Sequence, residues 1–184
     1  MDSAKKTTNS AKKTSFSQVD LAQIAKKHNE KGTAEQHFDM HIDEMGNWFH
    51  QGGEIKRKAL VKLFASVLTR LDDGEYWLIT PAERGKISVA DVPFYVNTMR
   101  IESEGNNQVI FLKTSLDDEI ALGQDHHIRI EDDDAAKGPR PYVNIKGKLD
   151  ALIARSVYYE LAEHAEDNNG VFTIKSGGVD IKLS

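Results

Sequence analysis

The residues of this sequence that could do chemistry gather in one short stretch, HIDEMGNWFHQGGEI, from His41 to Ile55. His41, Asp43 and His50 carry side chains that bind metal ions or transfer protons in enzymes. Glu83, further along the chain, could add a carboxylate. One hypothesis is therefore a hydrolase-type enzyme that uses His41, Asp43 and Glu83.

The geometry of a turn decides whether the two histidines meet. Residues 38–43 alternate apolar and polar side chains, which predicts a half-buried strand. Asp43 at the first turn position and Gly46 at the fourth favour a type I turn with a left-handed glycine. The expected cross-strand pairs are Ile42–Trp48, Met40–His50 and His41–Phe49. His50 then lies on the opposite face from His41 and Asp43.

Two groups on one face are too few for a metal site, which needs three ligands or more. The alternative two-residue loop would bring His41 opposite His50, but it would require Met45 at positive φ. The chain also has no Walker loop, dinucleotide fingerprint, nucleophile elbow or zincin motif. We therefore predict no metal, no cofactor and no catalytic residue.

The end of the same stretch offers a different chemistry. Three cations in a row start a predicted helix, where they oppose the positive end of the helix dipole, and an anion would relieve this. Backbone N–H groups of the preceding Gly-Gly pair could also bind a phosphate or carboxylate. The alternative is that these side chains extend into water with Glu54 as a counter-charge. The candidate anion-binding residues here are Gly52, Gly53, Lys56, Arg57 and Lys58.

Other residues complete this hypothesis of a non-catalytic binding or regulatory module. Trp48 or Tyr142 would offer a stacking face, and Arg140 or Arg155 a second cationic arm. A third hypothesis is a pure protein-interaction domain that binds a partner through exposed strand edges.

The sequence around these residues divides the chain into four expected parts. Residues 1–15 are a polar, lysine-rich tail that cannot bury enough apolar surface to order. Residues 16–31 contain a short helix with Ser17 as N-cap, which we expect to dock on the body. Its core-facing side chains are Leu21, Ile24, Ala25 and His28. An N-terminal α+β module follows at 32–85, and a β-rich module with one helix at 86–184.

The expected helices and strands follow hydrophobic periodicity. Helices are expected at 56–71 and 150–165, the second with Asp150 as its N-cap. Strands are expected at 75–80, 94–101, 108–114, 119–122, 127–130 and 142–145, with a loop at 132–138 and a terminal hairpin around Gly177-Gly178.

The chain also resembles itself at an offset of 94 positions, which lays Trp48 on Tyr142, Gly53 on Gly147 and Asp73 on Asp167. The shared unit is strand, glycine turn, helix, glycine, strand. Chance agreement between two such units is the alternative. If the repeat is real, two related modules pack together, and their interface is a favoured ligand location.

Composition limits the function classes. The chain has 184 residues, 39% of them hydrophobic, and no cysteine, so it can bury a core without disulfides and has no thiol nucleophile. We expect a cytoplasmic protein, because no apolar run approaches the roughly 20 residues of a membrane helix and no signal peptide is visible. A net charge of −5 argues against DNA as a partner.

Four segments together resemble the bacterial family known as domain of unknown function 1285. They lie at 41–68, 74–83 (GEYWLITPAE), 89–94 (VADVPF) and 139–145 (PRPYVNI), and the resemblance extends from Phe38 to the C-terminus. It implies an α+β protein with a duplicated motif and a C-terminal part superficially like a pleckstrin-homology domain. It also implies a ligand site at the domain interface, a nucleotide-like ligand and a role in signal transduction, without known catalytic residues.

Overall fold

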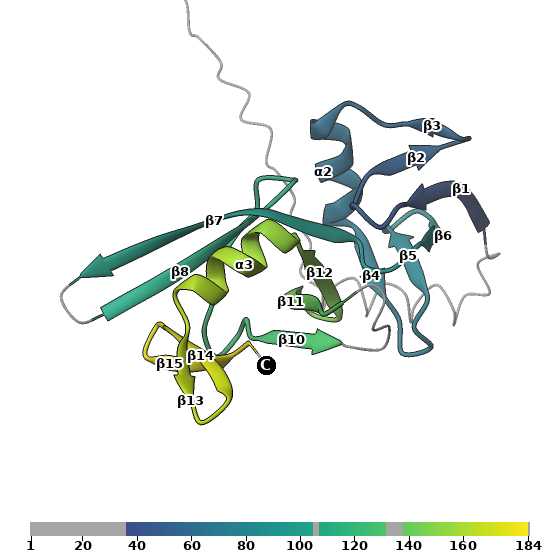
Figure 1. Ribbon diagram of the computed structural model, residues 1–184. Coiled ribbons are helices and arrows are strands. Elements are labelled where there is room, and N and C mark those ends of the chain that lie inside the picture. Colours follow the sequence, from purple (N-terminus) through teal and green to yellow (C-terminus); the bar gives the residue numbers. More distant parts are fainter. Residues whose placement is uncertain (1–35, 105–106, 132–137, 184) are drawn as a thin grey trace, which may run out of the picture.

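The computed structural model describes residues 36–104, 107–131 and 138–183. The predicted tail and N-terminal helix, and most of the loop predicted at 132–138, lie outside the described residues. The described chain is α+β, with two short helices and mostly antiparallel strands (Figure 1).

The first sheet has six strands in the order β3-β2-β1-β6-β5-β4. Their bounds are β1 Gln36–Ile42, β2 Trp48–His50, β3 Gly53–Glu54, β4 Leu68–Arg70, β5 Tyr76–Ile79 and β6 Arg84–Val89. Helix α2, Lys58–Ser66, connects β3 to β4. We call residues 36–92 the N-terminal module. Its sheet continues to Val89, beyond the predicted boundary at residue 85, because β6 pairs with both β5 and β1.

The C-terminal module, residues 93–183, holds a second six-stranded sheet in the order β10-β11-β12-β7-β8-β9 and a three-stranded sheet, β13-β14-β15. The bounds are β7 Phe94–Glu104, β8 Asn107–Thr114, β9 Glu119–Ala121, β10 Ile128–Glu131, β11 Arg140–Lys146, β12 Leu149–Ile153, α3 Arg155–Glu163, β13 Glu166–Asn168, β14 Val171–Ser176 and β15 Val179–Lys182. Strands β7 and β8 form a long hairpin that extends away from the rest (Figure 1).

The two six-stranded sheets share one order of strands. Each consists of two antiparallel three-stranded meanders, and a parallel pair joins the first strand of the sheet to its last. That pair is β1 with β6 in the first sheet and β7 with β12 in the second.

The predicted hairpin register is confirmed. Met40 pairs with His50, His41 with Phe49, and Ile42 with Trp48. Gly46 has φ +75°, and its N–H donates to the Asp43 carbonyl at 3.1 Å, as the turn chemistry requires. The predicted terminal hairpin is also present, with Ser176 opposite Val179.

Both helices are shorter than predicted. The apolar pattern after Ser66 continues into strand β4, so α2 ends well before residue 71. Asp150 is not an N-cap, because it lies within β12, and α3 begins at Arg155 after Ala154. The starts of the two helices are therefore not related by the 94-position offset.

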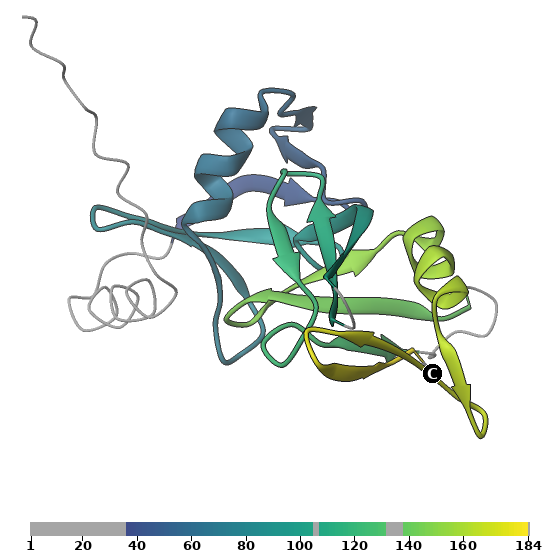
Figure 2. The ribbon, with the colours of Figure 1, turned by 90° about the vertical axis from the view of Figure 1, so that its left-hand side faces the viewer.

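One main hydrophobic core runs through both modules. It includes Trp48 and Leu68 from the N-terminal module and Phe94, Leu149 and Ile153 from the C-terminal one. The blue α2 and the yellow hairpin β14–β15 lie at opposite ends of this body (Figure 2). Neither helix of the described chain has the length and apolar character needed to cross a membrane.

Polar contacts also join the modules. Lys146 Nζ donates to the Ala65 carbonyl at the end of α2, at 3.0 Å. Asp117, in the β8–β9 turn, accepts from Lys58 and Lys62 of α2 at 2.9 and 3.1 Å.

We expect Gly85→Ala to lower the free energy of unfolding by about 1–3 kcal/mol, because the added methyl group would overlap the Phe38 ring. Gly123→Ala is a matched control, since its Cβ would meet no atom within 4 Å. Urea denaturation measures both, and a second change, Phe38→Leu, should recover part of the Gly85→Ala loss. Equal stabilities of the two glycine variants would contradict this.

Candidate ligand-binding site

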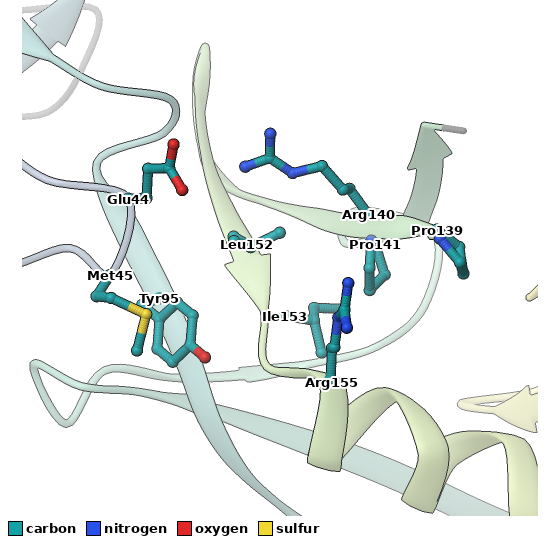
Figure 3. A pocket seen from close by; sticks show the side chains of 9 residues that line it. All are labelled: Glu44, Met45, Tyr95, Pro139, Arg140, Pro141, Leu152, Ile153 and Arg155. Atoms are coloured by element: carbon teal, nitrogen blue, oxygen red, sulfur yellow. The ribbon is translucent and has the colours of Figure 1, made fainter. Parts of the chain in front are cut away.

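A pocket lies between the two modules, with a volume of about 240 Å³ (Figure 3). The β1–β2 turn of the N-terminal module supplies Glu44 and Met45, and the C-terminal module supplies the other walls. The lining residues are Glu44, Met45, Tyr95, Pro139, Arg140, Pro141, Leu152, Ile153 and Arg155. Two of the residues selected from the sequence, Arg140 and Arg155, thus meet here.

Arg155 brings positive charge to the pocket in two ways. It is the first residue of α3, so its guanidinium lies beside the positive end of the helix dipole. The first turn of α3 has no acidic residue, and the N-cap Ala154 makes no side-chain capping bond. This end of the pocket therefore favours an anionic group.

Arg140 is held by a carboxylate of the segment that joins the modules. Its Nη2 donates to Asp91 Oδ2 at 2.7 Å, and the Tyr142 hydroxyl donates to the same oxygen at 3.1 Å. The Asp91 carbonyl accepts from the Tyr76 hydroxyl of the N-terminal module at 3.5 Å. Asp91 therefore connects both modules to a wall of the pocket and restricts the Arg140 side chain.

Tyr142 is a buried structural residue. Its ring lies beneath the guanidinium groups of Arg129 and Arg140, at 4.7 and 5.8 Å from the ring centre. The side chain is 2% exposed and does not line the pocket. Its predicted role as a stacking face for a ligand has no support in this position.

Burial, together with the Asp91 carboxylate, raises the pKa of Tyr142 to about 12. Because the hydroxyl is harder to ionise in the folded than in the unfolded protein, whose tyrosine pKa is about 10, stability should fall as the pH rises from 10 towards 12. We expect wild type to lose about 1 kcal/mol more than Tyr142→Phe between pH 9 and pH 11. Urea titrations at each pH measure this, and parallel curves would contradict it.

The rest of the pocket is mainly apolar. In Figure 3 the Met45 side chain lies beside the Tyr95 ring, and the Tyr95 hydroxyl points towards the open centre. Leu152, Ile153 and the prolines line the opposite wall. Glu44 is the single acidic residue of the lining, and it belongs to the N-terminal module, whereas Arg140 belongs to the C-terminal one.

Trp48 lies away from this pocket. It is 1% exposed, in the main core, with its ring stacked on Phe64 at 6.0 Å between centroids. It cannot stack on a ligand in this position. Gly52 lies in the exposed β2–β3 turn and Gly53 is the exposed first residue of β3, and neither is part of the pocket lining.

The cationic run at the start of α2 has an intramolecular anion. Lys56 and Arg57 precede the helix, and Lys58 is its first residue. Hydrogen bonds from Lys58 and Lys62 lower the pKa of Asp117 to about 2. The relief that the sequence predicted from an anionic ligand thus comes, at Lys58, from a carboxylate of the C-terminal module.

Glu83 is not brought together with His41 and Asp43, the other two groups of the enzyme hypothesis. Asp43 accepts hydrogen bonds from the N–H groups of Met45 and Asn47 and so stabilises its own turn. His41 Nδ1 lies 3.0 Å from Ser88 Oγ, near the end of β6. Glu83 precedes the start of β6, about 16 Å away along the strand at roughly 3.3 Å per residue.

A second hollow, of about 320 Å³, follows β1 and is lined by His37, Asp39, His41 and Ser88 among others. Within residues 36–104, 107–131 and 138–183, no three histidine, aspartate or glutamate side chains gather closely enough to hold a metal ion.

Sequence reasoning missed the lining residues Glu44, Met45, Tyr95, Leu152 and Ile153. Glu44 and Met45 were assigned only to a turn, and Leu152 and Ile153 to a helix. The sequence did contain one signal, because it places a large apolar residue, Met45, at the tip of a predicted hairpin. In the structure this side chain is 52% exposed. An exposed apolar residue next to a module interface is typical of a contact or ligand surface.

Comparison with known proteins identifies relatives of both modules. The model of the DUF1285 N-terminal domain, a domain of unknown function, matches residues 28–92. The model of the DUF1285 C-terminal domain, a protein of unknown function, matches residues 93–183. None of the curated proteins compared matches the chain.

Two solved structures are similar. A DUF1285 family protein from Silicibacter pomeroyi DSS-3 is 35% identical, with a TM-score of 0.74 and 82% of each chain covered. A DUF1285 family protein from Shewanella baltica OS155 is 24% identical, with a TM-score of 0.54, over 68% of this chain and 91% of the other. The second likeness concerns the fold alone.

Proposed function

The chain belongs to the DUF1285 family, and from this premise we propose that it is a non-catalytic binding protein that holds a small anionic, nucleotide-like ligand between its two modules. The observation that carries the proposal is the pocket at the module junction, whose walls come from both modules and whose lining includes Arg140 and Arg155.

The two arginines suit an anion in different ways. A guanidinium presents several N–H donors in a plane and matches carboxylate and phosphate oxygens. Arg155 adds its charge to the dipole of α3, and Asp91 fixes the orientation of Arg140. A phosphate or carboxylate between them would interact with two cations and one helix end.

The size and polarity of the pocket limit the ligand. Pockets for drug-sized molecules usually enclose about 300–1,000 Å³. A volume of about 240 Å³ is below this range, so the pocket would enclose the anionic part and one ring, while the remainder stays in solvent. Tyr95, with Met45 beside it, takes the stacking role that the sequence assigned to Trp48 or Tyr142.

We expect Arg155→Ala and Arg140→Ala each to weaken anion binding by about 10- to 100-fold, the loss expected for one hydrogen bond to a charged group. Thermal-shift titration with nucleoside mono- and diphosphates, cyclic nucleotides and inorganic phosphate measures this. Arg57→Ala is the matched control, because Arg57 is an exposed arginine outside the pocket lining.

The outcomes separate the hypotheses. Equal losses in the Arg57 and Arg155 variants would contradict a specific pocket. Weaker anion binding in the Arg57 variant alone would place the site at the Gly52–Lys58 segment. No stabilisation of wild type by any of these anions would overturn the proposal.

The finer implications of the family resemblance belong to the same proposal: a role in signal transduction, a duplicated motif, a pleckstrin-homology-like C-terminal part and a cytoplasmic location. The two six-stranded sheets have the same strand order, which supports a duplication. This duplication relates whole sheets and not the residues aligned by the 94-position offset. A cysteine-free sequence supports a reducing compartment.

The protein-interaction alternative has less support. Strand addition needs a long unpaired edge. The outermost strands of the two six-stranded sheets, β3, β4, β9 and β10, have only two, three, three and four residues.

A further inference from the structure

The face of the first sheet that points away from the main core carries deeply buried residues. On β5, Tyr76 and Leu78 belong to the main core, and the alternating residues Trp77 and Ile79 point to the other side. Trp77 is 3% exposed and Ile79 is 0% exposed. Among the described hydrophobic residues, only Leu71 packs against this pair.

Two neighbouring strands extend this buried area. Thr69 of β4 is paired with Trp77, and Arg84 of β6 is paired with Ile79, so all four share the outer face. Thr69 and Arg84 are each 4% exposed, and the Arg84 guanidinium lies 4.9 Å from the centre of the Trp77 ring. We call Thr69, Trp77, Ile79 and Arg84 the outer patch.

The burial of the outer patch requires a cover. A tryptophan exposes a large ring, and hiding nearly all of it on the outer face of a sheet takes a packed layer of side chains. Leu71 is one half-buried side chain and cannot form such a layer alone. Because these exposed fractions are those of the single chain, the cover must come from elsewhere in this chain.

We propose that residues 16–31 of this chain cover the outer patch. The described chain begins at Gln36, which pairs with Gly85, the neighbour of Arg84. Residues 32–35 span at most about 14 Å when extended, at roughly 3.3–3.6 Å per residue. Adjacent strands are about 4.8 Å apart. The segment before residue 32 is thus within reach of the outer patch.

The chemistry of the segment matches that of the patch. Its predicted helix has an apolar face of Leu21, Ile24 and Ala25, suited to Trp77 and Ile79, and Lys26 lies on the opposite face. Asp20 supplies a negative charge that complements Arg84.

The absence of cysteine from the whole sequence allows a direct test in the full-length protein. We expect a single thiol introduced by Ile24→Cys to react with a soluble maleimide at least tenfold more slowly than one introduced by Lys26→Cys. Labelling is measured over a wide range of protein concentrations. Equal rates would overturn the proposal, and protection that appears only at high concentration would assign the cover to a second copy of the chain.

A second measurement tests whether residues 16–31 lie on the outer patch. In full-length Ile24→Asp, acrylamide quenching of tryptophan fluorescence should rise severalfold, because Trp77 becomes accessible while Trp48 stays in the main core. Lys26→Asp is the matched control and should leave the quenching unchanged. Amide exchange should stay slow in β11 and β12 of both variants, which separates local exposure from unfolding. Unchanged quenching in Ile24→Asp would overturn the proposal.

Discussion

Replacement of Trp48 by alanine is expected to lower the free energy of unfolding by about 3–5 kcal/mol, the usual cost of removing a buried aromatic side chain. Trp48 is 1% exposed and stacks on Phe64, so its removal leaves a large cavity between β2 and α2. Thermal or urea denaturation measures the loss.

Trp48→Phe is the control that separates the core role from a ligand role. Phenylalanine keeps an aromatic ring in the core and removes the indole Nε1, which is buried without a hydrogen-bond partner in the described structure. It should cost much less than alanine, because leaving a buried donor unpaired is itself unfavourable. Anion affinity should be unchanged in Trp48→Phe, and a tenfold loss of affinity in a folded Trp48→Phe protein would restore Trp48 as a ligand contact.

Asp91→Asn is expected to lower the free energy of unfolding by about 1–3 kcal/mol. The amide has the size of the carboxylate but not its charge, so the part-buried Arg140 loses its ion pair and Tyr142 loses a charged acceptor. The loss stays below that of a fully buried pair, because water still reaches both partners.

Asp72→Asn provides the matched control. Asp72 pairs with Lys148 across the modules, but its side chain is 97% exposed, so water screens the pair. We expect no measurable change in urea denaturation. A double-mutant cycle of Asp91→Asn with Tyr142→Phe should show coupling between the two, and additive losses would mean that Asp91 does not act through the Tyr142 hydroxyl.

The sequence predictions were accurate where interactions between residues close in the chain determine the structure, and less accurate where distant residues do. The β1–β2 hairpin was predicted to its register, because Asp43 and Gly46 define the turn through local hydrogen bonds and a left-handed φ. The terminal hairpin was likewise set by Gly177-Gly178, both with positive φ.

The predicted helix boundaries were wrong where a segment fits both the helical and the strand periodicity. The sequence after Ser66 remains apolar at helical spacing, but its residues pair with β5 in a sheet. Residues 149–153 (LDALI) can likewise be placed on a helix or on a strand, and tertiary pairing with β7 and β11 decides for the strand.

The candidate site could be predicted only in part. Arg140 and Arg155 were selected for their charge, and the module interface for its general preference as a ligand location. The lining itself combines residues 44–45, 95, 139–141, 152–153 and 155, which only the tertiary fold brings together. For Trp48 and Tyr142, the sequence does not distinguish an aromatic side chain that faces a ligand from one that packs in the core.

The parallel pairs that close both six-stranded sheets have a consequence for how the chain folds as it is synthesised. In the first sheet Ile42 pairs with Val89, and in the second Phe94 pairs with Ala151, so each sheet needs the two ends of its own segment. Such distant contacts form slowly, because a long loop must close first. The first sheet can close once Val89 has left the ribosome, before the second sheet has emerged. The pocket forms only after Arg155 has emerged, so the proposed ligand would bind only to a chain whose second sheet is complete.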